Sequence, residues 1–186
     1  DEALKLLKNH LKDEKNVLHS IETEAIMRKL PEELDRDPEV WGMLGLLHDI
    51  DWEKTEDKPE KHTLKTEEIL KEKGFSDEFI RVIQSHNYGW KGGEFEDHQR
   101  NKPVEHALGA AETITGLIFA YALMRDKRVS DMTPKKLKKK FKDKSFAANC
   151  DRDIIKESKK LGISLKEFFS ISIEAMSEIA PKLGLK

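Results

Sequence analysis

The amino-acid sequence predicts an all-α fold. Apolar residues recur at steps of three and four over most of the 186-residue chain, which is the spacing of a buried helix face. Proline, serine and aspartate stand where such helices would begin, and glycine stands where they would end. The chain shows no β-hairpin pattern. With 37% hydrophobic and 38% charged residues, we expect a helical core under a densely charged surface.

The first two helices are predicted from apolar spacing and from capping residues. One spans Val17 to Leu30, where six apolar side chains share a face: Val17, Leu18, Ile21, Ala25, Ile26 and Leu30. The next runs from Pro38 to about His48. Asp37 is placed as its N-cap, Pro38 as its first residue and Glu39 as its first-turn acid.

Two shorter helices and a loop come next. One helix spans Leu64 to Lys73 and is closed by Gly74. Ser76 can cap the following helix, which runs toward His86. Residues 87–102 contain three glycines and mixed charges, so they predict a loop. Long loops in compact domains are often functional.

The second half of the chain begins with the longest predicted helix, from Pro103 to about Arg125. Its many alanines suggest a central, closely packed element. A further helix starts near Asp151 and stops at Gly162. The last helix opens with a capping box and ends before Pro181; the capping residues are Ser164 and Glu167.

We therefore expect two parts within one structural domain. Residues 1–128 would form the helical core, and residues 129–186 a C-terminal helical extension packed on it. Between Arg125 and Lys144 the chain has ten lysines and arginines against three aspartates. The segment Lys135–Lys144 reads as a solvated helix face with Leu137 and Phe141 on a buried edge. The alternatives to a solvated face are that the segment contacts a phosphate-rich substrate or that it binds nucleic acid.

Composition limits location and partners. The net charge of −2 gives no strong attraction to nucleic acid or to a membrane surface. No apolar run of about 18 residues and no signal-peptide pattern is found, so we expect no membrane span. The single cysteine, Cys150, indicates a reducing, cytoplasmic location. It lies beside charged residues and is expected to be structural. No feature indicates an oligomeric state.

Several histidines stand where a helix meets a loop. His48 and Asp49 end one helix, His62 precedes another, and His86 ends a third. Imidazole and carboxylate together suit a divalent transition metal such as Mn, Fe, Ni, Co or Zn. A histidine at a helix end can equally cap the last carbonyls. Spacing alone leaves both readings open.

The order of these residues resembles the HD superfamily of metal-dependent phosphohydrolases. His19 lies in "VLHSIETEAIM", His48 and Asp49 lie in "GLLHDID", and "HALGAAETITGLIFA" follows on the long helix. In the last segment Glu112 stands where the family has aspartate. His62 in "PEKHTLKTEEIL" and His86 in "IQSHNYGW" stand where two-metal members have further histidines. The resemblance covers about residues 15 to 180 and extends to a subgroup of hydrolases of unknown substrate.

The resemblance implies a helical bundle with one or two metal ions inside it. His19, His48, Asp49 and Glu112 would hold the first ion. Asp49 would bridge to a second ion held by a histidine pair, His62 and His86. His48 and Asp49 would be the catalytic residues, and metal-activated water would attack the phosphorus of a small phosphate ester, with a nucleotide as the expected substrate. The alternative is a catalytically weak HD module that binds a nucleotide as a sensor or partner domain.

Each of four polar residues near these segments has two possible roles. Asp51 could accept a hydrogen bond from a ligand histidine or cap the following turn. Lys54, Lys65 and Arg100 are candidate contacts for the substrate phosphate. The competing reading for each of the three is a solvated surface charge.

Overall fold

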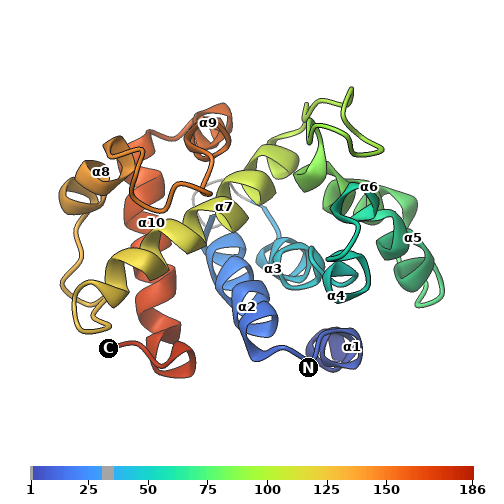
Figure 1. Ribbon diagram of the computed structural model, residues 1–186, viewed down its shortest axis with the longest axis horizontal. Coiled ribbons are helices and arrows are strands. Elements are labelled where there is room, and N and C mark those ends of the chain that lie inside the picture. The colour runs from blue at the N-terminus through green and yellow to red at the C-terminus, as the bar shows by residue number, and fades with distance from the viewer. Residues whose placement is uncertain (1, 31–35) are drawn as a thin grey trace.

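The computed structural model describes residues 2–30 and 36–186, which form helices and turns with no strand among them (Figure 1). The predicted all-α class is confirmed. The longer elements and their bounds are α1 (Glu2–His10), α2 (Glu14–Lys29), α3 (Pro38–Leu47), α4 (Trp52–Thr55), α5 (Leu64–Lys71), α6 (Asp77–Gln84), α7 (Pro103–Leu123), α8 (Pro134–Lys142), α9 (Arg152–Lys156) and α10 (Leu165–Ile179). Short 3₁₀ helices are η2 (Pro59–Lys61), η3 (Ser85–Asn87), η4 (Glu157–Leu161) and η5 (Ala180–Leu183).

Side-chain caps begin several of these helices where the sequence predicts them. The Asp37 carboxylate accepts a hydrogen bond from the N–H of Glu39 at 2.8 Å and starts α3. The Ser76 hydroxyl accepts from the N–H of Phe79 and starts α6. Ser164 and Glu167 form the predicted capping box of α10. Each cap satisfies backbone donors that a helix leaves unpaired in its first turn.

The α1 helix is absent from the sequence-based prediction, which begins at Val17. Its nine residues bury Leu7 completely, and Leu11 just beyond its end is also buried. So short a helix is marginal on its own in water. Packing of these leucines on the rest of the core therefore accounts for its stability.

The α7 helix crosses the middle of the molecule diagonally in Figure 1, with α2 and α3 beneath it. Its small and branched side chains are fully buried, including Ala107, Ala110, Ala111 and Ile114. Its length and composition alone would allow it to cross a membrane, but most of it is buried inside the protein. Glu105, His106 and Glu112 interrupt its apolar sequence, and the burial marks α7 as a core helix.

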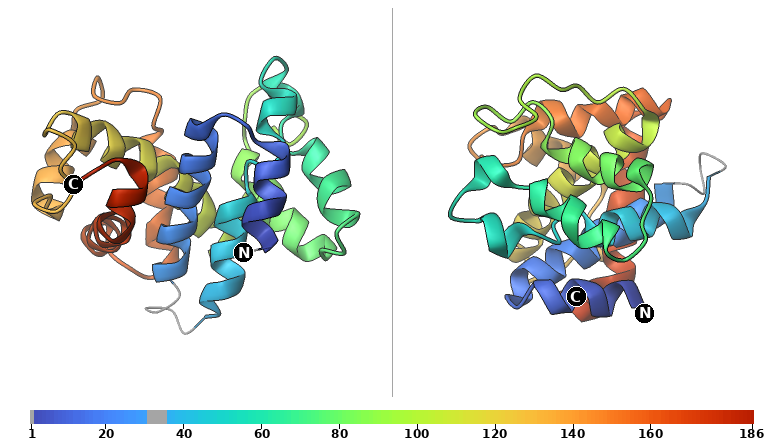
Figure 2. Two further views of the ribbon diagram at one scale, coloured as in Figure 1. Left: turned by 90° about the horizontal axis from the view of Figure 1, so that it is seen from below. Right: turned by 90° about the vertical axis from the view of Figure 1, so that its right-hand side faces the viewer.

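The C-terminal helices share one hydrophobic core with the rest of the chain. The α10 helix packs against α2 and α8, and α9 and η4 pack against α7. Figure 2 shows the α8–α10 group and the α5–α6 pair at opposite ends of the molecule. On α8 the predicted edge is buried at Leu137 and Phe141, and lysines occupy the exposed face.

Candidate metal centre

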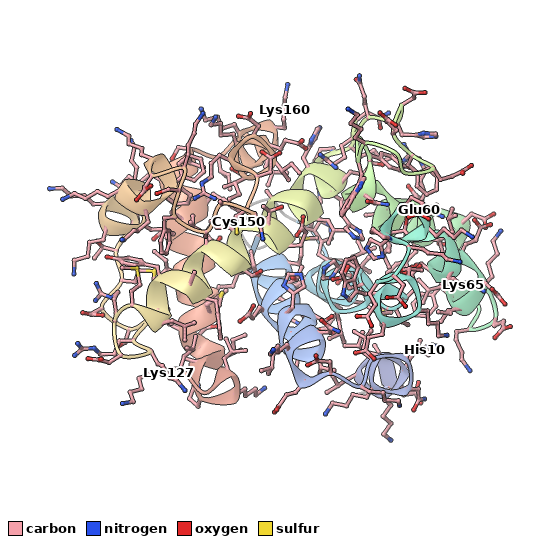
Figure 3. The ribbon with its side chains drawn as sticks, viewed as in Figure 1. His10, Glu60, Lys65, Lys127, Cys150 and Lys160 are labelled. Carbon is pink, nitrogen blue, oxygen red and sulfur yellow. The ribbon has the colours of Figure 1, made fainter. Side chains whose placement is uncertain are left out.

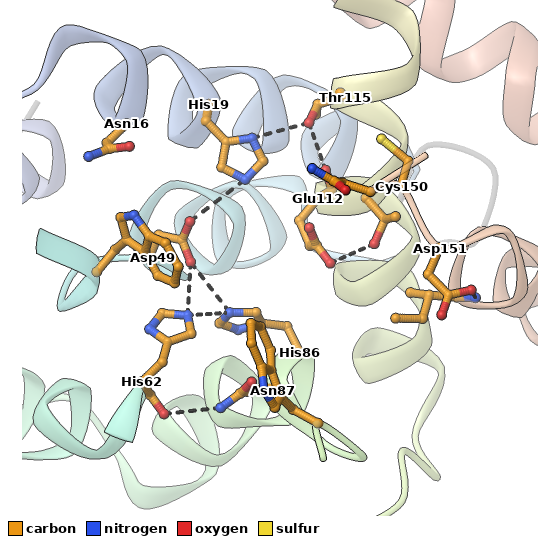
Figure 4. A pocket seen from close by; sticks show the side chains of 16 residues that line it. Asn16, His19, Asp49, His62, His86, Asn87, Glu112, Thr115, Cys150 and Asp151 are labelled. Atoms are coloured by element: carbon orange, nitrogen blue, oxygen red, sulfur yellow. Dashed lines mark hydrogen bonds and ion pairs between the residues drawn. The ribbon is translucent and has the colours of Figure 1, made fainter. Parts of the chain in front are cut away.

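Four histidines and one aspartate converge beside α7; Figure 4 shows His19, Asp49, His62 and His86 of this group. The buried, apolar α3 helix ends with His48 as its C-cap. There the chain turns sharply, because the Ile50 N–H donates to the Leu47 carbonyl at 3.2 Å. This turn places Asp49 beside His48. His19 comes from the middle of α2, and the other two histidines come from the short 3₁₀ segments, His62 as the C-cap of η2 and His86 within η3.

The two oxygens of the Asp49 carboxylate face different histidine pairs. Oδ2 lies 3.4 Å from Nε2 of His48 and 3.7 Å from Nε2 of His19. Oδ1 lies 3.1 Å from Nε2 of His62 and 3.4 Å from Nε2 of His86. The ligand atoms of each group lie within 4.8 Å of one another. Each group could hold one metal ion, with the carboxylate shared between them.

The other ring nitrogen of each histidine is turned toward an acceptor outside the centre. Nδ1 of His48 donates to the Gly45 carbonyl at 2.8 Å, and Nδ1 of His86 donates to the Ile83 carbonyl at 2.6 Å. Nδ1 of His62 lies 2.9 Å from Oδ1 of Asp51. The carbonyl acceptors hold the ring proton of His48 and His86 on Nδ1, so the Nε2 lone pairs of these two rings point inward, and the carboxylate beside Nδ1 favours the same tautomer in a neutral His62.

His19 is oriented by a hydroxyl group. Nδ1 of His19 lies 3.1 Å from Oγ1 of Thr115. The Thr115 hydroxyl donates to the Glu112 carbonyl at 2.6 Å. Its single proton is thereby used, so Thr115 accepts the hydrogen bond from His19.

The distances between the Nε2 atoms show whether a metal ion fits this site. The Nε2 atoms of His48 and His19 are 3.3 Å apart, and those of His62 and His86 are 2.9 Å apart. Lone pairs facing each other at these distances repel unless a proton or a cation lies between them. With a carboxylate alongside, the donor set is the one that divalent transition metals prefer. The residues present therefore fit a metal ion in each group.

Burial and charge set the protonation states of the centre. Burial lowers the pKa of His48 to about 3, against the opposing charge of Asp49, so this imidazole is neutral. Burial by itself would raise the pKa of Asp49. The neighbouring histidines, His48, His62 and His86, outweigh it and hold that pKa well below its usual value. Burial also opposes the charged form of His62, but Asp49 and Asp51 raise its pKa to about 10.

Asp51 supports the centre and also caps a helix. Its Oδ1 faces His62, as one of the two predicted readings requires. Its Oδ2 accepts from the N–H groups of Lys65 at 3.1 Å and Thr66 at 3.2 Å, in the first turn of α5. The helix that follows Asp51 directly, α4, receives no such cap from it. Asp51 thus fixes His62 to α5.

Glu112 lies in the same cavity, although its carboxylate is not part of either histidine–aspartate group. Its Oε1 accepts a hydrogen bond from the Thr113 hydroxyl at 2.6 Å. Burial raises the pKa of Glu112. The structure brings the residue to the centre, and ligation by Glu112 stays a prediction.

The cavity over the centre has a volume of about 450 Å³. Beyond the histidines and acids, its walls come from α2, the 87–102 loop, α7 and the segment 149–154; the lining residues that sequence reasoning did not single out are Asn16, Trp52, Asn87, Trp90, Thr113, Thr115, Gly116, Asn149, Asp151 and Ile154. Thr115 could have been sought three residues after Glu112, one turn along the same helix face. Cys150 also lines the cavity, and burial raises the pKa of its thiol, which fits the expected structural role.

The three predicted phosphate contacts lie outside this cavity. Lys54 and Lys65 line a separate surface depression of about 270 Å³, and Figure 3 shows Lys65 at the far end of the molecule from Lys127. Arg100 is only 8% exposed and makes two hydrogen bonds to Glu157 of η4, at 2.7 and 2.8 Å. It also donates to the carbonyls of Ser85, His86 and Tyr88. Arg100 therefore holds the turn that carries His86.

A family model described as HD domain matches residues 17–125. The matched segment contains every histidine and acid of the centre. Neither the curated proteins nor the solved structures contain a match to the chain.

Proposed function

The chain belongs to the HD domain family, and from this premise we propose that it is a metal-dependent phosphohydrolase acting on a small phosphate ester, with a nucleotide as the expected substrate. The observation that carries the proposal is the Asp49 carboxylate placed between two inward-facing histidine pairs. A carboxylate shared in this way suits two neighbouring metal ions in a phosphoryl-transfer site.

The residues of the chain would perform three tasks in this reaction. His19, His48, His62 and His86 would hold one or two divalent ions, and Asp49 would hold both. A bound ion supplies Lewis acidity that polarises a phosphoryl oxygen and activates water near neutral pH. Asp51 and Thr115 would keep the rings of His62 and His19 in their ligating orientation. Glu112 could join the first ion through Oε2 while its Oε1 keeps the hydrogen bond from Thr113.

The overall reaction needs no nucleophile from the protein. Water forms a bond to phosphorus while the bond from phosphorus to the leaving alkoxide breaks. The attacking water gives up a proton and the alkoxide takes one up, so the products are the phosphate and the alcohol. In keeping with this, the one cysteine at the cavity has a raised pKa, whereas a nucleophilic thiol needs a lowered one.

The first experiment compares the protein with its Asp49→Asn variant. Gently purified protein should carry roughly one to two transition-metal ions per chain, and hydrolyse at least one member of a panel of phosphomonoesters, dinucleotides and cyclic nucleotides with Mn, Ni or Co. Asp49→Asn should lose bound metal and lower kcat by about a hundredfold or more, since partners of the ligands alone are worth ten- to a hundredfold. Elemental analysis and steady-state kinetics measure both effects.

Asp57→Asn is the matched control, because Asp57 is exposed and lies outside the cavity. It should leave metal content and turnover unchanged. Protein that takes up no metal rejects the proposal. Metal-loaded protein that binds nucleotides without turning over any substrate favours the sensor module instead.

A further inference from the structure

The cavity over the metal centre has no lysine or arginine among its lining residues within the part of the chain that the structure describes. Its ionisable side chains apart from the histidines and Cys150 are acids: Asp49, Glu112 and Asp151. Asp151 lies across the cavity from Asp49 in Figure 4 and caps α9 by accepting from the N–H of Asp153 at 2.7 Å. Positive charge for a bound phosphate would therefore come from the metal ions.

The guanidinium groups nearest in sequence to the cavity walls are already engaged. Arg100 is committed to Glu157 and to the carbonyls around His86. Arg152, next to Asp151, donates to the carbonyls of Phe141, Ala147 and Cys150. Neither can turn into the cavity without abandoning several hydrogen bonds.

Charge balance then limits the ligand. Two divalent ions next to the carboxylates of Asp49 and Glu112 leave a surplus of about two positive charges, and one phosphate monoester group balances it with about two negative charges at neutral pH. A diphosphate or triphosphate brings further negative charge that would lie beside Asp151 and Glu112 without a counterion. Unpaired charge near like charge in a partly desolvated site is strongly unfavourable.

The rest of the cavity offers aromatic and apolar surface. Trp90, on the 87–102 loop, is 45% exposed and lines the cavity together with Trp52 and Ile154. The Trp52 ring is fixed by an edge-on contact with His62, at 5.1 Å between ring centroids. An exposed indole beside a phosphate site is a stacking surface for a planar ring.

One buried acceptor in the wall lacks a hydrogen-bond donor among the described residues. Oδ1 of Asn87 has no partner, although this side chain is only 4% exposed. Its Nδ2 is fixed by donation to the His62 carbonyl at 3.1 Å. Because Oδ1 is itself buried, Asn87 belongs to the wall through its bond to the His62 carbonyl and is not an open contact for a ligand.

We infer that the cavity takes an ester with a single phosphoryl group joined to a planar, uncharged organic part, and that it discriminates against diphosphates and triphosphates. The inference rests on the proposed phosphohydrolase function and narrows its substrate class. Monoesters and diesters share the required chemistry, so the experiment includes both.

The test uses metal-loaded, desalted protein and one nucleoside as its mono-, di- and triphosphate, with p-nitrophenyl phosphate and bis(p-nitrophenyl) phosphate as monoester and diester arms. The value of kcat/KM should fall by roughly tenfold or more for each added phosphate, since each adds an uncompensated charge. Equal or better hydrolysis of the triphosphate overturns the inference.

Binding of the same nucleotides, measured by quenching of tryptophan fluorescence, separates this inference from the proposed function. Absence of turnover with every substrate rejects the hydrolase. Tighter binding of the monophosphate than of the triphosphate would still support the charge preference, and the reverse order would overturn it.

Two lysine variants test the electrostatic cause. Asn149→Lys adds a cation to the cavity wall and should raise the ratio of triphosphate to monophosphate kcat/KM by about tenfold. Ala148→Lys adds the same charge at an exposed neighbour outside the cavity and should leave the ratio unchanged. An unchanged ratio in Asn149→Lys, or an equal rise in both variants, overturns the inference. Trp90→Ala should raise KM for the nucleoside monophosphate but not for methyl phosphate.

Discussion

At the scale of single residues, the outer ring nitrogen of each histidine in the metal centre faces an acceptor from a different residue. A backbone carbonyl orients His48, a carboxylate faces His62, and a threonine hydroxyl orients His19. The predicted ligand set comes from the resemblance to the HD superfamily, because the spacing of His48 and Asp49 alone leaves a metal site and a helix cap both open. Thr115 is 96 residues away from His19 in the chain, so only the packing of α7 on α2 identifies it as the partner.

Arg100 is a second case in which a partner distant in the sequence could not be predicted. Its position in a glycine-rich loop near the site made a phosphate contact a reasonable prediction. The structure pairs it instead with Glu157, 57 residues further along the chain. A bidentate partner at that separation has no local sequence signal.

Glu22 of α2 gives a prediction about stability. It is 5% exposed, and burial raises its pKa to about 8. The folded protein therefore holds this proton more tightly than the unfolded chain, whose carboxyl has an ordinary pKa near 4.5. The free energy of unfolding should fall as pH rises from about 4.5 to 8. Glu22→Gln should remove this dependence and stabilise the protein at pH 7 by roughly 2 to 4 kcal/mol.

Urea unfolding of both proteins between pH 4.5 and 8.5 measures the difference. Glu14→Gln, at the exposed start of the same helix, controls for the loss of a negative charge. It should change stability by less than about 1 kcal/mol. A constant difference between Glu22→Gln and the parent across this pH range would contradict the raised pKa.

At the scale of elements, the metal centre depends on how closely α2 and α3 approach. These helices carry His19 and His48, and they touch at Gly45. A Cβ atom at Gly45 would lie 2.9 Å from the backbone carbonyl of Thr23. The sequence predicts both helices from their apolar faces and caps, but it cannot predict this contact, because a glycine inside a helix has many possible reasons.

Gly45→Ala should push α2 and α3 apart and separate His19 from His48. We expect a loss of about 1 to 3 kcal/mol of stability from overpacking, with metal affinity lowered on the order of tenfold. Chemical unfolding with chelator present and metal titration measure the two effects separately.

Gly42→Ala on the same helix is the control. The atoms nearest to its Cβ would belong to the Arg28 side chain, which can move away by loosening its ion pairs with Glu24 and Glu39. Both substitutions gain the same helix propensity, so the difference between them isolates the backbone contact. Equal metal affinity in the two variants would argue against this account of the α2–α3 contact.

At the scale of the whole molecule, the centre joins segments that lie far apart in the sequence. The ligands come from α2, the end of α3, η2 and η3, with α7 beside them. Metal ions held there would cross-link the core helices. A ligand that binds only the folded state stabilises it by mass action.

Metal loading should therefore raise Tm. At a free metal concentration of about a thousand times Kd, the expected stabilisation is about 4 kcal/mol. Differential scanning calorimetry with Mn or Ni and with chelator measures the shift. Asp49→Asn should show the same Tm in both conditions. A metal-dependent rise in that variant as large as in the parent would place the stabilising ion elsewhere.

The segment 149–154 forms one wall of the cavity but lies outside the part of the chain that matches the HD domain model. The metal-ligating residues and this one wall of the cavity thus occupy separate stretches of sequence. Substitutions in this wall can change which ester enters while the ligand geometry stays intact. Proteins that share the core can in this way diverge in substrate, and exchanging this short segment offers a route to re-engineer selectivity.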